Sequence, residues 1–154
     1  MVVENGPDWW VKIADFGISK RRHDATTLQT LQRGTMGFAA PEAVGMSSDT
    51  DEGPYSTAVD IWSLGAVAFL MLTGKSAFRN FAELAGYCSG NRDFPLEPLE
   101  SFSVSSEGQG FVASLMMLAP EARPTADKAL QHLWMDGAIS LAEDAEAKIS
   151  ETTT

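Results

Sequence analysis

The hydrophobic pattern of the chain is dominated by one run, from Ile61 to Leu72, which only Ser63 and Gly65 interrupt. Residues 57–60 at its start match a helix capping box, and Gly74 after its end is a typical helix stop. The run is too short to cross a bilayer. Because a helix that is apolar on every side is buried, we predict a central helix over about residues 57–73.

Shorter patterns flank this run. Apolar residues at 1–3 and 10–14, with the turn signal Asn5-Gly6-Pro7-Asp8 between them, predict a short β-hairpin. Apolar residues at helical spacing predict further helices, which we place at residues 81–88, 107–118, 126–135 and 138–149. Residues 41–44 form about one helical turn, and residues 91–104 form a connector. The predicted fold is mainly α, with a short β-hairpin at the N-terminus.

Composition and charge narrow the class of protein. The chain has 154 residues, of which 44% are hydrophobic, and this is enough for one domain with a core. Its net charge of −10 argues against a nucleic-acid or anionic-membrane surface. The single cysteine, Cys88, cannot form an internal disulfide, and residues 1–20 lack the apolar core of a signal peptide. We therefore expect a cytoplasmic protein, with a nuclear location also compatible.

Two tripeptides bracket the stretch of residues 15–42. Asp15-Phe16-Gly17 follows the second predicted strand, and Ala40-Pro41-Glu42 closes the stretch shortly after Gly34-Thr35. An aspartate after a buried strand can hold the metal ion that bridges phosphates, and a following glycine allows the backbone to turn sharply. The alternative for the first tripeptide is an ordinary strand-end turn, where Asp and Gly are common.

The two tripeptides, in this order and with a loop-like interval, resemble the activation segment of a eukaryotic protein kinase, which runs from a DFG to an APE motif. Residues 60–65 also match the D-x-W-S-x-G signature of that family. The resemblance extends from about Val2 to Trp134 and covers the C-terminal lobe of the kinase domain. Gly34-Thr35 and Phe38 before the APE motif are similar to the serine/threonine type.

The resemblance implies roles for residues of the activation segment. Asp15 would be a magnesium ligand, Phe16 and Gly17 would belong to the nucleotide site, and Thr35 would lie in the last part of the segment. Three threonines near the basic stretch Lys20-Arg21-Arg22 are candidate phosphorylation sites: Thr26, Thr27 and Thr30. A phosphate there could pair with the basic residues and order the loop. An unregulated, solvated polar loop remains the alternative.

The resemblance also implies two contacts outside the loop. Arg123, in Arg123-Pro124-Thr125, would form a buried ion pair with Glu42, and we expect this pair to anchor the activation segment to the helices. Asp60 would hydrogen-bond the backbone of the catalytic loop, and its capping role at the helix start is the alternative. The sequence departs from the family pattern at three positions, Ala77, Ala119 and Leu133. These local changes do not disturb the resemblance.

Several parts of an active kinase are missing from the sequence. No glycine-rich loop, no V-A-I-K lysine and no H-R-D-x-x-x-x-N motif is found, and the chain begins a few residues after the place of the family's catalytic asparagine. We therefore name no catalytic residue. The intact family uses ATP and Mg²⁺, whereas we expect the isolated chain to be inactive and a poor binder of both.

The sequence therefore predicts a partial protein serine/threonine kinase domain over residues 1–135, with an activation segment at 15–42 and an acidic tail at 136–154. The expected partners are protein substrates or regulatory proteins, without nucleic acid or membrane. Two alternatives remain open. The chain could be a non-catalytic docking or regulatory module, or a truncated product without a role of its own.

Overall fold

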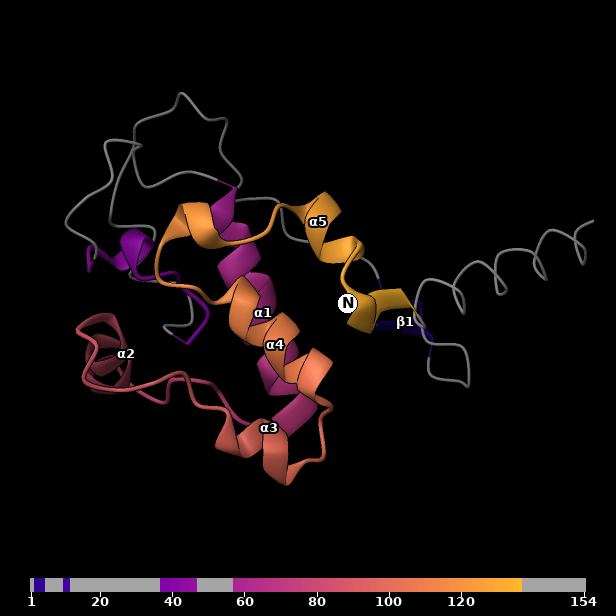
Figure 1. Cartoon of the computed structure of the whole chain (residues 1–154), viewed down its shortest axis with the longest axis horizontal. Helices are drawn as coiled ribbons and strands as arrows, with labels where there is room; N and C mark the ends of the chain where they lie inside the picture. The colour runs from indigo at the N-terminus through magenta and orange to yellow at the C-terminus, as the bar shows by residue number, and fades with distance from the viewer. Residues whose placement is uncertain (1, 5–9, 12–36, 47–56, 137–154) are drawn as a thin grey trace, which may run out of the picture.

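The computed structural model describes residues 2–4, 10–11, 37–46 and 57–136. Within these ranges the fold is helical, built around a pair of long helices (Figure 1). Two short strands, β1 (Val2–Glu4) and β2 (Trp10–Val11), pair in antiparallel fashion, with Val2 opposite Val11 and Glu4 opposite Trp10. The turn that we predict between them and the predicted helix at 138–149 lie outside the described residues.

Helix α1 (Ala58–Thr73) confirms the long helix that the apolar run predicts. It ends at Gly74, which adopts a left-handed conformation with φ of 66° and donates its backbone N–H to the Leu70 carbonyl at 2.8 Å. The predicted capping box is wrong. Thr57 has helical dihedral angles, and its side chain makes no capping hydrogen bond, so α1 begins without a side-chain cap.

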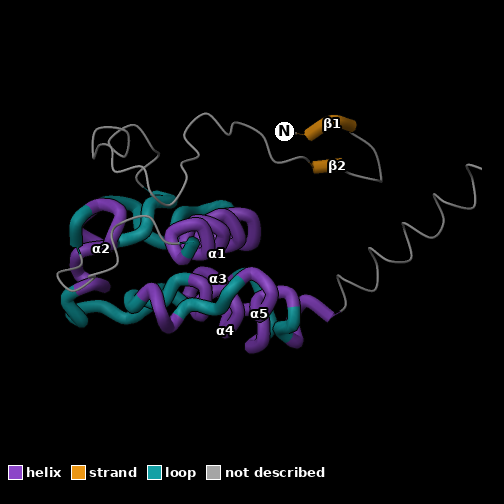
Figure 2. Tube along the Cα trace, turned by 90° about the horizontal axis from the view of Figure 1, so that it is seen from above, coloured by secondary structure: helices purple, strands orange, loops and turns teal. Residues whose placement is uncertain are grey.

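Helix α4 (Ser106–Leu115) crosses α1 at close range, and the two lie in adjacent layers (Figure 2). Gly65 makes this crossing possible, because a Cβ atom at its position would lie 2.6 Å from Met116 Cγ and 2.9 Å from Leu115 Cβ. The Ser105 hydroxyl caps α4 by accepting the Gly108 N–H at 3.3 Å. The predicted helix at 107–118 is therefore present, but it ends at Leu115.

Helix α2 (Phe81–Cys88) has the bounds that its apolar pattern predicts. The Asn80 side chain caps it by accepting the Glu83 N–H at 3.0 Å. The predicted connector at 91–104 differs from the structure, since it contains a short helix, α3 (Glu97–Ser101). Pro98 lies in the first turn of α3, where its missing N–H costs no helical hydrogen bond.

The C-terminal part is more broken than its pattern predicts. The 3₁₀ turn η4 (Pro120–Ala122) leads into α5 (Ala126–Leu130), and a second 3₁₀ turn, η5 (Leu133–Met135), follows. The single helix predicted at 126–135 is wrong because His132 is extended, and its Nδ1 accepts the Trp134 N–H at 3.2 Å. This break allows the Trp134 ring to pack 5.3 Å from the ring of Phe111 on α4.

The core lies between α1 and α4. Its largest fully buried side chains come mainly from these helices: Trp62, Phe69, Leu99, Leu115, Met116, Val112 and Thr73. The expectation that α1 is buried on every side is wrong. Leu64, Val67 and Met71 are 48%, 41% and 81% exposed, and their spacing places them on one face of the helix, which we call the exposed α1 face. In the described ranges, no helix is both long and apolar enough for a membrane span.

Candidate functional site

The end of the predicted activation segment is held by a buried ion pair. Glu42 opens the 3₁₀ turn η3 (Glu42–Val44), in the region where we predict one helical turn. Arg123 Nη1 donates to Glu42 Oε1 at 2.5 Å, and Nη2 donates to Oε2 at 2.9 Å. The two side chains are 0% and 5% exposed. This two-pronged geometry is the strong form of an arginine–carboxylate pair, and it confirms the predicted pairing of Glu42 with Arg123.

Backbone carbonyls satisfy the remaining N–H groups of Arg123. Its Nε donates to the Met117 carbonyl at 2.7 Å, Nη1 to the Ala58 carbonyl at 2.9 Å, and Nη2 to the Leu118 carbonyl at 3.2 Å. A guanidinium group has five N–H donors, so each donor has a partner. Arg123 therefore links the segment end to the start of α1 and to the residues after α4.

An aromatic cluster supports this ion pair from one side. The guanidinium carbon of Arg123 lies 5.1 Å from the centroid of the Trp62 ring, a cation–π distance. The Trp62 ring stacks on Phe78 with centroids 6.1 Å apart, and Phe78 stacks on Tyr87 at 5.2 Å. The Tyr87 hydroxyl donates to the Met116 carbonyl at 3.1 Å, and burial raises the pKa of Tyr87. The cluster therefore fixes α1 relative to α2.

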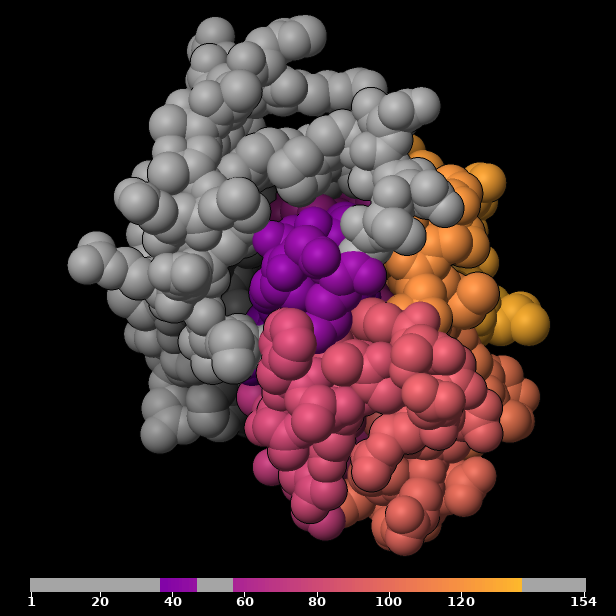
Figure 3. Space-filling view, turned by 90° about the vertical axis from the view of Figure 1, so that its left-hand side faces the viewer, coloured from indigo at the N-terminus to yellow at the C-terminus, as the bar shows by residue number. Residues whose placement is uncertain are grey.

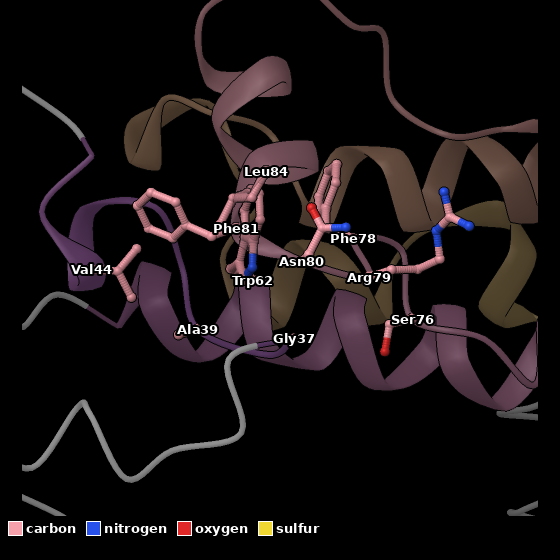
Figure 4. A pocket seen from close by; sticks show the side chains of 10 residues that line it. All are labelled: Gly37, Ala39, Val44, Trp62, Ser76, Phe78, Arg79, Asn80, Phe81 and Leu84. Carbon is pink, nitrogen blue, oxygen red and sulfur yellow. The ribbon is translucent and has the colours of Figure 1, made fainter.

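A cavity of about 290 Å³ opens beside the segment end (Figure 4). Its lining comes from the segment end, η3, α1, the connector between α1 and α2, and α2: Gly37, Ala39, Val44, Trp62, Ser76, Phe78, Arg79, Asn80, Phe81 and Leu84. Most of the lining side chains are apolar, and Ser76, Arg79 and Asn80 supply polar groups. Residues 37–46, drawn in purple in Figure 3, lie at the surface between the pink and orange parts of the chain. We call this cavity the segment cavity.

A second cavity, of about 560 Å³, shares Ser76, Phe78 and Arg79 with the first. At its edge, the Glu83 carboxylate accepts hydrogen bonds from the Arg79 side chain and from the Arg79 backbone N–H. These bonds hold the pKa of Glu83 below its ordinary value. The charged residues that line the cavity balance each other: Lys75, Arg79, Arg92, Glu83, Asp93 and Glu97. The lining of the second cavity therefore carries no net formal charge.

The structure unites only part of the predicted site. Glu42 and Arg123 meet, whereas Asp60 is exposed in the first turn of α1 and its side chain makes no hydrogen bond within the described residues. The other predicted site residues lie outside the described ranges: Asp15, Phe16, Gly17, Thr26, Thr27, Thr30 and Thr35. Sequence reasoning missed two residues of the D-x-W-S-x-G signature that it identified: Trp62, whose ring lies beside Arg123, and Ser63, whose Oγ lies 2.9 Å from the Phe38 carbonyl oxygen.

The fold and the anchored segment end agree with a comparison against protein-family models. The model described as "Protein kinase domain" matches residues 1–135. The chain therefore belongs to the protein kinase domain family, and its relatives place it in the serine/threonine branch.

Curated relatives of known name are similar over most of this chain. It is 35% identical to serine/threonine-protein kinase cds1 of Schizosaccharomyces pombe, over 82% of this chain and 28% of the relative. It is 33% identical to serine/threonine-protein kinase RAD53 of Saccharomyces cerevisiae, over 88% of this chain and 17% of the relative. It is 36% identical to calcium/calmodulin-dependent protein kinase cmkA of Emericella nidulans, over 81% and 29%. The chain therefore spans less than a third of the length of each of these relatives.

Solved structures give the same family. The structure of the Rad53 kinase domain with SCD2 is similar with a TM-score of 0.62 and 31% identity, over 83% of this chain and 41% of the solved chain. A related structure of the Rad53 kinase domain and SCD2, in complex with AMPPNP, gives a TM-score of 0.52 and 32% identity, over 66% of this chain and 39% of the solved chain. An ATP analogue thus binds within this family.

Proposed function

We propose that this chain is the C-terminal lobe of a serine/threonine protein kinase, which presents the activation segment and the protein substrate during transfer of the γ-phosphoryl group of ATP. In this proposal residues 1–135 belong to the kinase domain, residues 15–42 form the activation segment and residues 136–154 form an acidic tail. The paired strands β1 and β2 would be the hairpin that leads into Asp15. Membership of the protein kinase family supports this assignment.

The observation that carries the proposal is the Glu42–Arg123 ion pair beside the segment cavity. Because Arg123 binds both Glu42 and the backbone of the helical core, the segment end is fixed while one of its edges faces a cavity lined mainly by apolar side chains. A fixed edge beside an apolar cavity suits the docking of an extended protein segment with one apolar side chain. Phosphoryl transfer depends mainly on such positioning.

The described residues do not by themselves form a magnesium site, since they contain no group of three His, Cys, Asp or Glu side chains that could hold a metal ion. We propose Asp15 as one magnesium ligand, next to Phe16 and Gly17 at the nucleotide site. One carboxylate holds Mg²⁺ poorly without substrate phosphates and further ligands. The Rad53 complexes with an ATP analogue support nucleotide use in the family.

The exposed α1 face supports two candidate functions. Three neighbouring apolar side chains at the surface of a helix mark a contact site. In the kinase proposal, the rest of a kinase domain covers Leu64, Val67 and Met71. In the second candidate function, a non-catalytic docking module, a regulatory protein covers them. The two candidates differ in whether a completed domain transfers phosphate.

Activity of a completed domain tests the proposal. We suggest fusing the part of the S. cerevisiae RAD53 kinase domain that precedes its stretch similar to this chain to residue 1 of this chain, so that no segment is duplicated, and measuring label transfer from ATP with Mg²⁺ to a generic protein substrate. We expect transfer by the chimera, none by this chain by itself, and loss of at least about 100-fold in an Asp15→Ala chimera, because phosphate positioning is lost. A folded chimera without activity would contradict the kinase proposal and favour the docking module.

A further inference from the structure

A hydroxyl group of α1 reaches the backbone of the segment end. Ser63 Oγ lies 2.9 Å from the Phe38 carbonyl oxygen, 25 residues earlier in the chain, and the contact is partly buried. The same hydroxyl lies 3.0 Å from the Val59 carbonyl oxygen, one helical turn before Ser63. A serine hydroxyl has a single proton, so it donates fully to only one of these two acceptors at a time.

The two acceptors differ in what else they bind. Val59 lies four residues before Ser63 in α1, so its carbonyl already accepts the Ser63 N–H of the helix. The Phe38 carbonyl has no other hydrogen-bond donor among the residues that the structure describes. Removal of the hydroxyl would therefore cost more free energy at the Phe38 carbonyl than at the Val59 carbonyl, because the half-buried Phe38 oxygen would be left without a hydrogen-bond partner.

The position of Phe38 gives this bond a consequence for docking. Its neighbours on both sides, Gly37 and Ala39, line the segment cavity. The ion pair holds the segment at Glu42, four residues further along, and the Ser63 hydroxyl is the tether at the cavity itself. We propose that Ser63 is a positioning residue, which fixes the cavity wall formed by Gly37 to Ala39 and so sets the affinity for a docked protein substrate. The docking part of this inference rests on the proposed kinase function.

The chain offers a matched control. Ser114 of α4 donates its hydroxyl to the Phe111 carbonyl at 2.7 Å and is partly buried, but this contact stays within α4 and does not touch the segment. Ser63→Ala and Ser114→Ala therefore remove the same atom from similar helical surroundings. Ser63→Thr keeps the hydroxyl, and a helical threonine can direct it toward the preceding turn.

Hydrogen exchange on this chain tests the tether without any assay of activity. In Ser63→Ala we expect the backbone N–H groups of residues 38–40 and 42–46 to exchange roughly 3- to 10-fold faster, the loss that corresponds to one hydrogen bond. Ser63→Thr should retain at least half of the protection, and Ser114→Ala should leave residues 38–46 unchanged. Unchanged exchange in Ser63→Ala, or an equal increase in Ser114→Ala, would overturn the inference.

Steady-state kinetics of the active chimera test the link to docking. Ser63→Ala should raise the KM for the protein substrate about 3- to 10-fold, while kcat and the KM for ATP stay within about 2-fold, because a loosened wall weakens binding and leaves the phosphate site untouched. A fall in kcat with an unchanged KM would overturn the role in docking. An inactive wild-type chimera would count against the proposed function, and the exchange result would still decide whether Ser63 holds the segment.

Discussion

Two of the arginine–glutamate pairs among the described residues are chemically alike and physically different. In the first, the Arg123 and Glu42 side chains are 0% and 5% exposed and come from residues 81 positions apart. In the second, Arg79 and Glu83 are four positions apart, and the Arg79 side chain is 76% exposed. Arg92 approaches the second pair to 3.9 Å and is also largely exposed.

The two pairs differ in how much of the folded structure each one requires. The Arg79–Glu83 pair joins the start of α2 to the residues just before it, so it needs only local helical geometry, and solvent screens it. The Glu42–Arg123 pair exists only when η3, α1 and the residues after α4 are assembled. Its buried charges require each other, because either one without its partner would be buried and uncompensated. The Glu42–Arg123 pair therefore depends on the assembled fold, whereas the Arg79–Glu83 pair depends only on the local structure at the start of α2.

The largest expected effect is that of Arg123→Ala. We expect it to lower the free energy of unfolding by about 3–5 kcal/mol, because it leaves the Glu42 carboxylate buried without its partner and removes three bonds to carbonyls. Urea or guanidinium unfolding followed by circular dichroism measures this. Arg79→Ala, which removes the same side chain from the exposed pair, is the control and should shift the midpoint far less. A loss below about 1 kcal/mol in Arg123→Ala would place the pair at the level of surface pairs.

The contrast between the two pairs also explains what the sequence could predict. Helices α1 and α2 follow from apolar spacing and from the stop residue Gly74, which are local signals. The Glu42–Arg123 pair was predicted only through the family motifs, since no local pattern relates residues 81 positions apart.

Two of the wrong predictions concern tertiary packing, which a local sequence pattern does not specify. The single helix predicted at 126–135 breaks at His132 because Trp134 packs back on Phe111 of α4, which is a tertiary contact. The exposed α1 face was predicted to be buried because its residues are hydrophobic. Hydrophobicity indicates that a surface tends to be covered, but it does not identify the segment or the partner that covers it. The Ser63 tether to Phe38 has no local signal either, because a serine in a helix is ordinary.

The second effect in size is that of Glu42→Gln. Glutamine keeps one oxygen acceptor, and Arg123 keeps its three backbone carbonyls and the Trp62 ring, so the arginine remains partly compensated. We expect a loss of about 2 kcal/mol, the size of a hydrogen bond to a charged group. The same unfolding experiment measures it, with Glu121→Gln, an exposed glutamate of η4, as the control. A loss equal to that of Arg123→Ala would show that the carbonyl bonds contribute little.

The smallest effect on stability is expected for Glu83→Gln. The pH dependence of this effect distinguishes the exposed Arg79–Glu83 pair from the buried Glu42–Arg123 pair. The hydrogen bonds from Arg79 lower the pKa of Glu83 in the folded chain below the value of about 4.3 for an unfolded glutamate. The stabilisation by this carboxylate is therefore fully present above that value, and it is lost as the pH falls through the lowered pKa of the folded state.

The stabilities of the wild type and Glu83→Gln should consequently differ most between about pH 6 and 8, and they should converge in acid, below about pH 4. Salt should also reduce the difference, because the Arg79 side chain is solvent-exposed and the Debye length shrinks to about 3 Å at 1 M. Thermal unfolding of both proteins across this pH range, at low and high salt, measures the effect. A difference that grows as the pH falls, or one that 1 M salt leaves unchanged, would show that the exposed pair behaves like the buried one and would remove the distinction between them.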